Sequence, residues 1–441
     1  MIRGVGSPII EVKYPIKFRE EDAKILGEHV RLRHNVNLIG AKRVGIGDFL
    51  NFFLYHKDIA RKYIDRHHKH LLIPVDLNDL VEIKLFAFWT LTFKRIVDAV
   101  GSLPVEPSVK KQINGLFLTS IQESDLFLTV ENLRKSLIEI AKTGILPTIF
   151  WLRFDRISEI TPIDFFANLQ GLREATGQKL CFVLTSYREI GKITPRLTEK
   201  LLPIFIHNFY IKPAGEKDAK VILHELVRKY HLKISGKLAK KIIEVSGGHA
   251  QYLYLTLIIL AQSLRDQKVD EKILLELISG DERLILQSEE IWDSLFDAEK
   301  DAIGLITEGK KVGVDLRFNA KYIWETGLVL RKFDRRQIFS PIFGAYVREN
   351  GKGKVNGSVE LTKKENLLFS LLLASQNEVC EREKIIEAVW AEYEDLGVSD
   401  WTIDKLVARL RNKLKEQGSD FSVITVKTRG YKLVSTKPNP S

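Results

Sequence analysis

The chain has 441 residues, enough for two to four domains, and its hydrophobic content of 45% is ordinary for globular proteins. The net charge of +11 excludes an acidic protein; it favours attraction to nucleic acid and a merely soluble basic surface about equally. The two cysteines, Cys181 and Cys380, lie far apart in apolar surroundings, which excludes a disulfide framework and indicates a reducing compartment.

The N-terminal residues do not form a signal peptide, because charges interrupt them at Arg3, Glu11 and Lys13. The longest apolar run, Tyr252–Ala261, is too short to span a bilayer. We therefore expect a soluble cytoplasmic protein without a membrane partner.

The first segment with a chemical meaning is a strand, a glycine-rich turn and a helix. After an amphipathic helix at about Glu20–Arg33, the sequence predicts a strand at Asn35–Ile39, a turn at Gly40–Asp48 and a helix at Phe49–Tyr63. This is the context of a phosphate-binding P-loop, whose pattern is GxxxxGK[ST]. Gly40 provides the first glycine of that pattern.

The turn departs from the P-loop pattern at the two positions whose side chains contact the phosphates and Mg²⁺. Gly45 provides the second glycine, but Ile46 replaces the lysine that contacts the phosphates, and Gly47 replaces the hydroxyl that holds Mg²⁺. Backbone N–H groups at the helix N-terminus still attract an anion, and Lys42 and Arg43 supply nearby charge. We expect a relic turn with no resident cofactor; ATP binding is the alternative, and hydrolysis is not expected.

Three apolar runs predict buried parallel strands, at Leu71–Leu77, Thr148–Leu152 and Lys179–Thr185. In P-loop ATPases the second of these strands ends in the acids that position Mg²⁺. Leu152 and Arg153 occupy those positions, and the nearby acid is Asp155. The degenerate nucleotide site would therefore consist of Gly40, Lys42, Arg43, Gly45, Gly47 and Asp155.

Two further groups have alternative interpretations. Arg188, after the third strand, is either a loop arginine or a sensor that faces the nucleotide pocket. His67, His68 and His70 are either a solvated basic surface or metal ligands, and their non-standard spacing favours the surface. No catalytic triad, zinc spacing or carboxylate pair is recognisable, so we predict no catalytic residue, no metal site and no enzyme activity.

Alternating strands and helices over residues 35–212 predict a parallel α/β sheet, and residues 213–280 predict a helical lid. The motifs are the GxxxxG turn, FDR at Phe154–Arg156, LTSYRE at Leu184–Glu189 and SGGHAQYL at Ser246–Leu253. Together they resemble the STAND and archaeal-type AAA+ ATPases. The resemblance implies a P-loop NTPase-like fold, but the replaced P-loop residues mean that it does not imply activity.

Residues 281–347 resemble the small winged-helix-like module that often follows the lid in STAND-like proteins. Helical faces there lead into β-prone runs at Leu330–Phe333 and Ile338–Phe339. Its helices lack a basic face, which favours a protein contact over DNA binding. Residues 348–357 are rich in glycine and charge and predict a linker.

The C-terminal segment combines an amphipathic helix with a hairpin. Ile403, Leu406, Val407, Leu410 and Leu414 fall on one helix face, and mostly basic residues fall on the opposite side. Two β-prone runs follow, Phe421–Lys427 and Tyr431–Val434. Residues 355–441 contain 13 basic and 13 acidic residues, so any basic surface must be confined to one face. Such a helix and hairpin suit a major groove and adjacent phosphates.

Residues 355–437 resemble the winged-helix DNA-binding domain of OmpR/PhoB-type response regulators. The residues that carry the resemblance are Leu361–Glu365, the helix Arg382–Trp390, Thr402–Asp404 with Arg409–Arg411, and the wing Val426–Leu433. Lys427, Thr428 and Ala408 depart from the usual family pattern. No receiver domain precedes this segment, so phosphorelay control is not predicted.

The resulting hypothesis is a DNA-binding transcriptional regulator with a degenerate ATPase-like domain as scaffold or sensor. Its partner would be double-stranded DNA, contacted through Thr402, Lys405, Arg409, Arg411, Lys413, Lys427, Arg429 and Lys432. Lys405 and Arg409 are the candidates for base edges. The alternatives are a nucleotide-switched STAND ATPase regulator and a non-catalytic assembly protein, in defence or transposition, with protein partners or self-association.

The predicted fold is therefore α/β with a P-loop NTPase-like parallel sheet and a helical lid, followed by two α+β winged-helix domains. The predicted segments are the α/β domain at 1–212, the lid at 213–280, the winged-helix-like module at 281–347, the linker at 348–357 and the DNA-binding winged helix at 358–437.

Overall fold

The computed structural model describes residues 9–162, 164–194, 206–263, 269–332, 335–350, 361, 363–390, 400–426 and 429–435. The chain divides into two compact units, Met1–Lys352 and Gly353–Ser441.

The first unit is built on a five-stranded parallel sheet. Its strands are β1 (Asn35–Gly40), β2 (His70–Asp76), β3 (Leu146–Leu152), β4 (Cys181–Ser186) and β5 (Ile206–Ile211). Their order is β2-β3-β4-β1-β5, and every neighbouring pair is parallel. The predicted parallel sheet is confirmed. The glycine-rich turn follows β1, an internal strand of this sheet.

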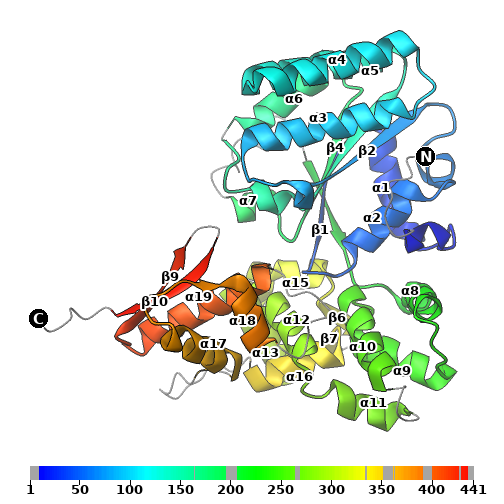
Figure 1. The fold of residues 1–441 in the computed structure, drawn as a ribbon. Helices are drawn as coiled ribbons and strands as arrows, with labels where there is room; N and C mark the ends of the chain where they lie inside the picture. Colours follow the sequence, from blue (N-terminus) through cyan, green and yellow to red (C-terminus); the bar gives the residue numbers. More distant parts are fainter. Residues whose placement is uncertain are drawn as a thin grey trace, which may run out of the picture. The chain divides into compact units, whose positions relative to one another are not determined.

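Helices cover both faces of the sheet, because alternate residues of a strand point to opposite sides. Phe150 and Val183 belong to a core that they share with α1 (Glu20–Arg31) and α2 (Ile46–Tyr55). Ile149, Trp151 and Phe182 belong to a second core, which they share with α3 (Leu85–Gly101), α4 (Pro107–Glu123), α5 (Leu126–Lys142) and α6 (Phe165–Ala175). Figure 1 shows α3–α6 gathered beyond one face of the sheet.

The helices of this domain are η1 (Ile10–Lys13), α1 (Glu20–Arg31), α2 (Ile46–Tyr55), η2 (Ala60–Ile64), η3 (Leu77–Asp79), α3 (Leu85–Gly101), α4 (Pro107–Glu123), α5 (Leu126–Lys142), η4 (Phe154–Ile157), α6 (Phe165–Ala175) and α7 (Ile190–Ile193). The predicted single helix Phe49–Tyr63 is wrong at its end. Helix α2 stops at Tyr55 because His56 adopts an extended conformation, with φ −73° and ψ 123°.

The predicted helical lid follows as α8 (Glu216–Lys229), α9 (Gly236–Ser246), α10 (Ala250–Ser263) and α11 (Glu271–Ile278). Further helices are α12 (Glu282–Asp293), α13 (Asp297–Thr307), α14 (Val314–Asn319), α15 (Lys321–Glu325) and α16 (Pro341–Asn350). An antiparallel hairpin, β6 (Val329–Lys332) and β7 (Arg335–Ile338), lies between α15 and α16, near the β-prone runs of the sequence.

Two glycines mark the junction of the lid with its neighbours. Gly247 and Gly248 have φ of +59° and +75° and lie between α9 and α10. A Cβ atom on Gly247 would lie 2.1 Å from the carbonyl oxygen of Phe339, and one on Gly248 would lie 1.9 Å from that of Ala214. Both positions therefore exclude a side chain.

The second unit is α+β, as predicted. It contains α17 (Lys363–Ala374), β8 (Cys380–Glu381), α18 (Arg382–Val389), α19 (Asp400–Glu416), β9 (Phe421–Val426) and β10 (Gly430–Ser435). The strands form a sheet in the order β8-β10-β9, and both pairings are antiparallel.

None of the described helices has both the length and the apolar content needed to cross a membrane.

Candidate functional sites

Two of the three glycines in the glycine-rich turn stand where a side chain would be crowded. Gly40 ends β1, and a Cβ atom there would lie 2.8 Å from Val44 Cγ1. Gly45 precedes α2 with φ +112°, and a Cβ atom there would lie 3.0 Å from Ala250 Cβ. Both positions therefore favour glycine for steric reasons. Gly47, in the first turn of α2, would have no atom within 4 Å of an added Cβ.

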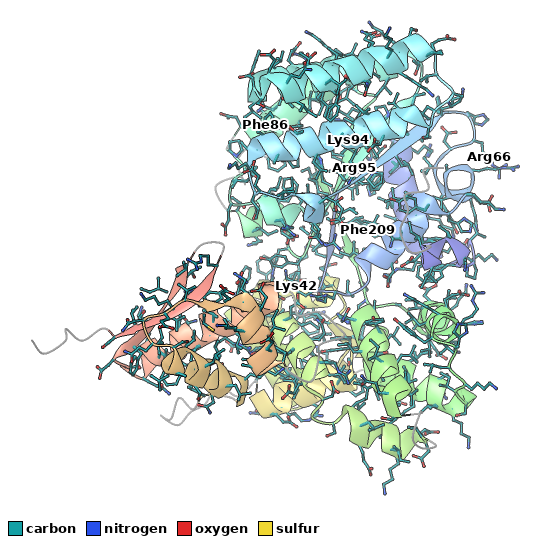
Figure 2. All side chains as sticks on the ribbon, in the orientation of Figure 1. Lys42, Arg66, Phe86, Lys94, Arg95 and Phe209 are labelled. Atoms are coloured by element: carbon teal, nitrogen blue, oxygen red, sulfur yellow. The ribbon has the colours of Figure 1, made fainter. Side chains whose placement is uncertain are left out.

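The two basic residues of the turn contact other groups of the same unit. Lys42, labelled in Figure 2, lies just beyond the carboxyl end of β1, and its Nζ is 3.8 Å from the centroid of the Tyr187 ring. Arg43 Nε donates to Glu290 Oε2 at 2.8 Å. Lys42 is stabilised there by a cation–π contact and Arg43 by an ion pair.

The lid is fastened directly to this turn. The ring Nε2 of the buried His249 donates to the carbonyl oxygen of Lys42 at 2.9 Å, and its Nδ1 accepts from the backbone N–H of Tyr252 at 3.4 Å. These partners require the neutral ring. Burial, the largest influence, lowers the pKa of His249 to about 4 and so favours the same form.

The residues at the turn do not fit a P-loop nucleotide site with Mg²⁺. Ile46 stands in the lysine position, and its Cδ1 would lie 3.0 Å from a Cβ on Gly40, so it packs into the turn. Gly47 stands in the position of the hydroxyl that would hold Mg²⁺ and supplies no ligand atom from a side chain. We therefore derive no hydrolytic step at this turn.

Arg188 forms a buried ion pair with α13. Its Nη1 donates to Glu299 Oε1 at 2.6 Å, and the two side chains are 4% and 2% exposed. Its guanidinium carbon lies 3.8 Å from the ring centroid of Tyr322 and 4.2 Å from that of Phe296. The arginine therefore joins the end of β4 to residues 294–322, whereas a sensor would face the glycine-rich turn.

In the second unit, one face of α19 is buried as the sequence predicted. The five apolar residues of that face are at most 3% exposed: Ile403, Leu406, Val407, Leu410 and Leu414. They share a core with Leu368, Val423 and Leu433. Helix α19 is thus held against α17 and the three-stranded sheet.

The basic side of α19 is less exposed than expected. Lys413 Nζ donates to Glu365 Oε2 at 2.5 Å, and Arg409 Nε lies 3.9 Å from Glu365 Oε1. Glu365 is 1% exposed, and the two cations are about a quarter exposed. A buried carboxylate needs such partners, so these residues lie against α17 instead of projecting into solvent. Burial lowers the pKa of Arg409 to about 10.

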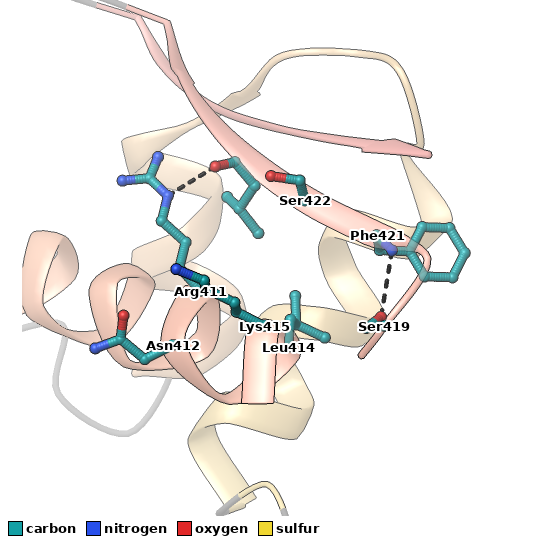
Figure 3. A pocket seen from close by; sticks show the side chains of 8 residues that line it. Arg411, Asn412, Leu414, Lys415, Ser419, Phe421 and Ser422 are labelled. Atoms are coloured by element: carbon teal, nitrogen blue, oxygen red, sulfur yellow. Dashed lines mark hydrogen bonds between the residues drawn. The ribbon is translucent and has the colours of Figure 1, made fainter. Parts of the chain in front are cut away.

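Arg411 connects α19 to the hairpin. Its Nε donates to the carbonyl oxygen of Val423 at 2.7 Å, as Figure 3 shows, and its Nη2 donates to Thr425 Oγ1 at 2.7 Å. A pocket of about 300 Å³ lies beside it, lined by the end of α19 and the start of β9, including Asn412, Lys415 and Ser419.

A polar cluster fixes the start of β10 against α18 and α19. Arg382 Nη2 donates to Asp404 Oδ1 at 2.6 Å and to the Tyr431 hydroxyl at 3.0 Å. The Tyr431 hydroxyl also donates to Asp404 Oδ1. Burial and this hydrogen bond raise the pKa of Tyr431 to about 12. Gly430 has φ +151°, and a Cβ atom there would lie 2.0 Å from the Cys380 carbonyl oxygen.

Residues 356–433 match the family model described as "Transcriptional regulatory protein, C terminal". This segment is an OmpR/PhoB-type winged-helix domain. Its relatives include the transcriptional regulatory protein YxdJ of Bacillus subtilis, 35% identical over 74 residues, and the response regulator ArlR of Staphylococcus aureus, 34% identical over 105 residues. These alignments cover 17% and 23% of this chain, and 31% and 47% of the relatives. The chain thus spans less than half of either relative.

A longer but more distant likeness is found among solved structures. The Walker-type ATPase of Pyrococcus abyssi aligns with 75% of this chain and 95% of its own length, at 14% identity and a TM-score of 0.44. A likeness this distant carries no argument about activity.

The predicted DNA contacts of the winged-helix domain differ in exposure. They are exposed at Arg429, half-buried at Arg409, Arg411, Lys413 and Lys432, and outside the described side chains at Thr402, Lys405 and Lys427. The exposed ridge of α19 includes Ala408, Asn412 and Lys415. Ala408 offers no polar atom to a base edge, whereas Asn412 and Lys415 carry polar groups.

Sequence reasoning considered one histidine group and missed another. His67 and His68 contact Asp65 through a backbone N–H and a ring nitrogen, and both are exposed, as a solvated surface requires. His70 is half-buried, and burial lowers its pKa to about 4, so it does not belong to that surface. Among the described residues, His29, His34 and His207 bring their ring nitrogens within 4.8 Å of one another. His29 and His34 are close in the sequence, but His207 comes from a distant part of it, so no local spacing could have revealed the three together.

Proposed function

We propose that this protein is a transcriptional regulator that binds duplex DNA through its winged-helix domain, while its N-terminal α/β domain serves as a scaffold or sensor without ATPase activity. The observation that carries the proposal is the OmpR/PhoB-type domain at residues 356–433, a family described as transcriptional regulatory proteins.

The geometry of the domain supports this role. Helix α19 is anchored by its apolar face and by the Glu365 ion pairs, so its opposite ridge is presented on a rigid support. The hairpin β9–β10 is tied to α19 through Arg411 and Tyr431, and Arg429 is exposed beside its tip. A helix for the major groove beside a basic wing for phosphates is the arrangement by which winged helices bind duplex DNA.

The binding test uses the full chain. Duplexes selected from a random pool are titrated by fluorescence anisotropy at several salt concentrations. Arg429→Ala removes a phosphate contact, so it should weaken binding to every sequence and reduce the salt slope by about one. Lys405→Ala removes a base-edge contact, so it should cost about 1–3 kcal/mol of preference for the selected site.

Lys272→Ala is the matched control, because this exposed lysine lies in α11 of the other unit. It should leave both quantities unchanged. Absence of salt-sensitive duplex binding by the full chain would reject the proposal.

The proposal that the α/β domain is not an ATPase is supported by Ile46 and Gly47, which provide neither a phosphate-binding charge nor a hydroxyl for Mg²⁺. Phosphate release from ATP and Mg²⁺ should equal the buffer background. Turnover that disappears on Gly45→Val would contradict it, because that substitution blocks the turn sterically.

A nucleotide-switched regulator is the second candidate, and the contact between His249 and the Lys42 carbonyl favours it. Through this contact, an anion bound at the turn would act on the lid. Calorimetry of the full chain with ATP and Mg²⁺ distinguishes the candidates. A dissociation constant below about 1 mM (about −4 kcal/mol) supports the switch, and weaker binding leaves the scaffold role.

A further inference from the structure

Three histidines lie close together at the amino-terminal ends of β1 and β5, whereas the glycine-rich turn follows the carboxyl end of β1. His29 lies near the end of α1, His34 immediately precedes β1, and His207 lies at the start of β5. One ring nitrogen from each lies within 4.8 Å of the other two. Because β1 rises about 3.3 Å per residue, the trio is about 20 Å from the turn that follows Gly40.

The backbone holds this trio in place. The N–H of His34 donates to the carbonyl oxygen of His29 at 2.9 Å, which closes the loop after α1. His207 is paired in register with Val36, two residues after His34, across the β1–β5 ladder. The three rings are therefore brought together by a helix end, a closed loop and a strand pairing.

The loop before His34 is clamped from the inside. Arg33 has φ +58°, the left-handed conformation that lets the chain reverse. Its Nη1 donates to the Val30 carbonyl oxygen at 3.0 Å and to Thr148 Oγ1 at 3.1 Å. Arg173 Nη2 donates to the Arg33 carbonyl oxygen at 3.1 Å. These contacts hold in place the backbone that leads into His34.

The geometry of the ring nitrogens is close to that of a ligand set. His29 Nδ1 and His34 Nδ1 are 3.2 Å apart. Two nitrogens at about 2.0–2.1 Å from one tetrahedral zinc ion are about 3.3 Å apart, so the separation of this hydrogen-bonded pair matches that of two zinc ligands. The His207 ring stacks on that of His34, with centroids 4.7 Å apart, and has to turn so that a ring nitrogen faces the other two.

The charges around the trio are compatible with neutral ligands. Burial, followed by the neighbouring His207 ring, lowers the pKa of His29 and of His34. Glu28 acts on both rings in the direction that favours a cation, and Arg173 acts on His34 in the opposite direction.

We propose that His29, His34 and His207 form a binding site for a divalent transition-metal ion of the zinc class. Three imidazoles and one position open to water or a further ligand are a recognised zinc coordination, and imidazole favours this class of ion over Mg²⁺ or Ca²⁺. The site is independent of the winged-helix domain and of the glycine-rich turn.

The test uses the full chain, freed of metal with a chelator. Co²⁺ replaces Zn²⁺ as a spectroscopic probe, because its visible absorption is intense when four ligands surround it tetrahedrally. Zinc content after gel filtration gives the stoichiometry. We expect one ion per chain, a tetrahedral cobalt spectrum, and displacement of cobalt by zinc.

The variants separate this site from other histidines. His34→Ala and His207→Ala should each weaken zinc binding at least about tenfold and abolish the cobalt spectrum, since even outer-shell changes cost about that much. His68→Ala removes a histidine of the exposed group near Asp65 and should leave both readouts unchanged. The thermal midpoint of each variant without metal establishes that it is folded; His207→Gln serves as a milder alternative to His207→Ala.

The absence of stoichiometric zinc in the unsubstituted chain would overturn the proposal, and the trio would then be only a hydrogen-bonded, stacked group. Binding that survives in folded His34→Ala and His207→Ala, or that depends on His68, would overturn it as well. Neither result affects DNA binding, so the two proposals fail independently.

Discussion

Replacing Glu299 with glutamine tests the buried ion pair that joins the α/β domain to α13. The change keeps the shape of the side chain and an oxygen for the backbone N–H of Phe296, which donates to Glu299 Oε2 at 2.8 Å. It removes the charge opposite Arg188, whose side chain is 4% exposed. Arg188 would keep the Ser294 carbonyl oxygen and two aromatic faces as partners, but no negative charge opposite its guanidinium.

The expected cost is about 3–5 kcal/mol, because removing one member of a buried pair leaves an uncompensated charge. Urea unfolding of the full chain measures the loss, and hydrogen exchange of the α13 amides localises it. The double variant Arg188→Met with Glu299→Gln should be less destabilised than the sum of the single variants.

Glu21→Gln is the control, because its pair with Lys24 is exposed at both side chains, 82% and 53%. An exposed pair contributes about 0–1 kcal/mol, so this variant should remain near the unsubstituted chain. If Glu299→Gln were no more destabilising than Glu21→Gln, the reasoning about the buried pair would be refuted.

Three further predictions concern stability. Glu365→Gln should lower the unfolding free energy of the winged-helix domain by about 1.5–3 kcal/mol, because a hydrogen bond to a charged group usually contributes that much. The loss should appear as a lower urea midpoint for that domain. Gly45→Ala should destabilise the folded chain by about 1–3 kcal/mol, because the φ of Gly45 is +112°. Gly47→Ala should be neutral or stabilise the chain by up to about 1 kcal/mol, because alanine favours a helix and has room there. Chemical denaturation of both variants tests this difference. Burial raises the pKa of Asp48 from 3.8 to about 7, so the native state holds a proton that the unfolded chain releases, and stability should fall as pH rises through that window. Asp48→Asn should flatten this dependence in thermal unfolding at pH 4 to 8; an unchanged profile would contradict it.

The parallel sheet was predictable because each strand is a short apolar run bounded by turn residues, as in Thr148–Leu152. The buried face of α19 was predictable for a similar reason, since helical periodicity fixes which residues share a side. Both are local properties of the sequence.

Long-range partners were not predictable. Arg409 and Lys413 were expected on an exposed face, and their contact with Glu365 spans 48 residues for Lys413. Arg188 meets its carboxylate partner 111 residues later. The histidine trio depends on the pairing of β1 with β5. Periodicity gives the side of a helix but not what lies against that side.

The Gly247–Gly248 turn constrains how this architecture diverges. Carbonyl oxygens from two other segments occupy the space in which both side chains would lie, so even alanine at either position forces the backbones apart. Homologues that keep the lid and the following hairpin should retain this dipeptide while their surrounding surfaces drift. In a relative with a bulkier residue at either position, the lid should be packed differently against the segments that supply these carbonyl oxygens. The two glycines can therefore be used to recognise relatives that keep this arrangement.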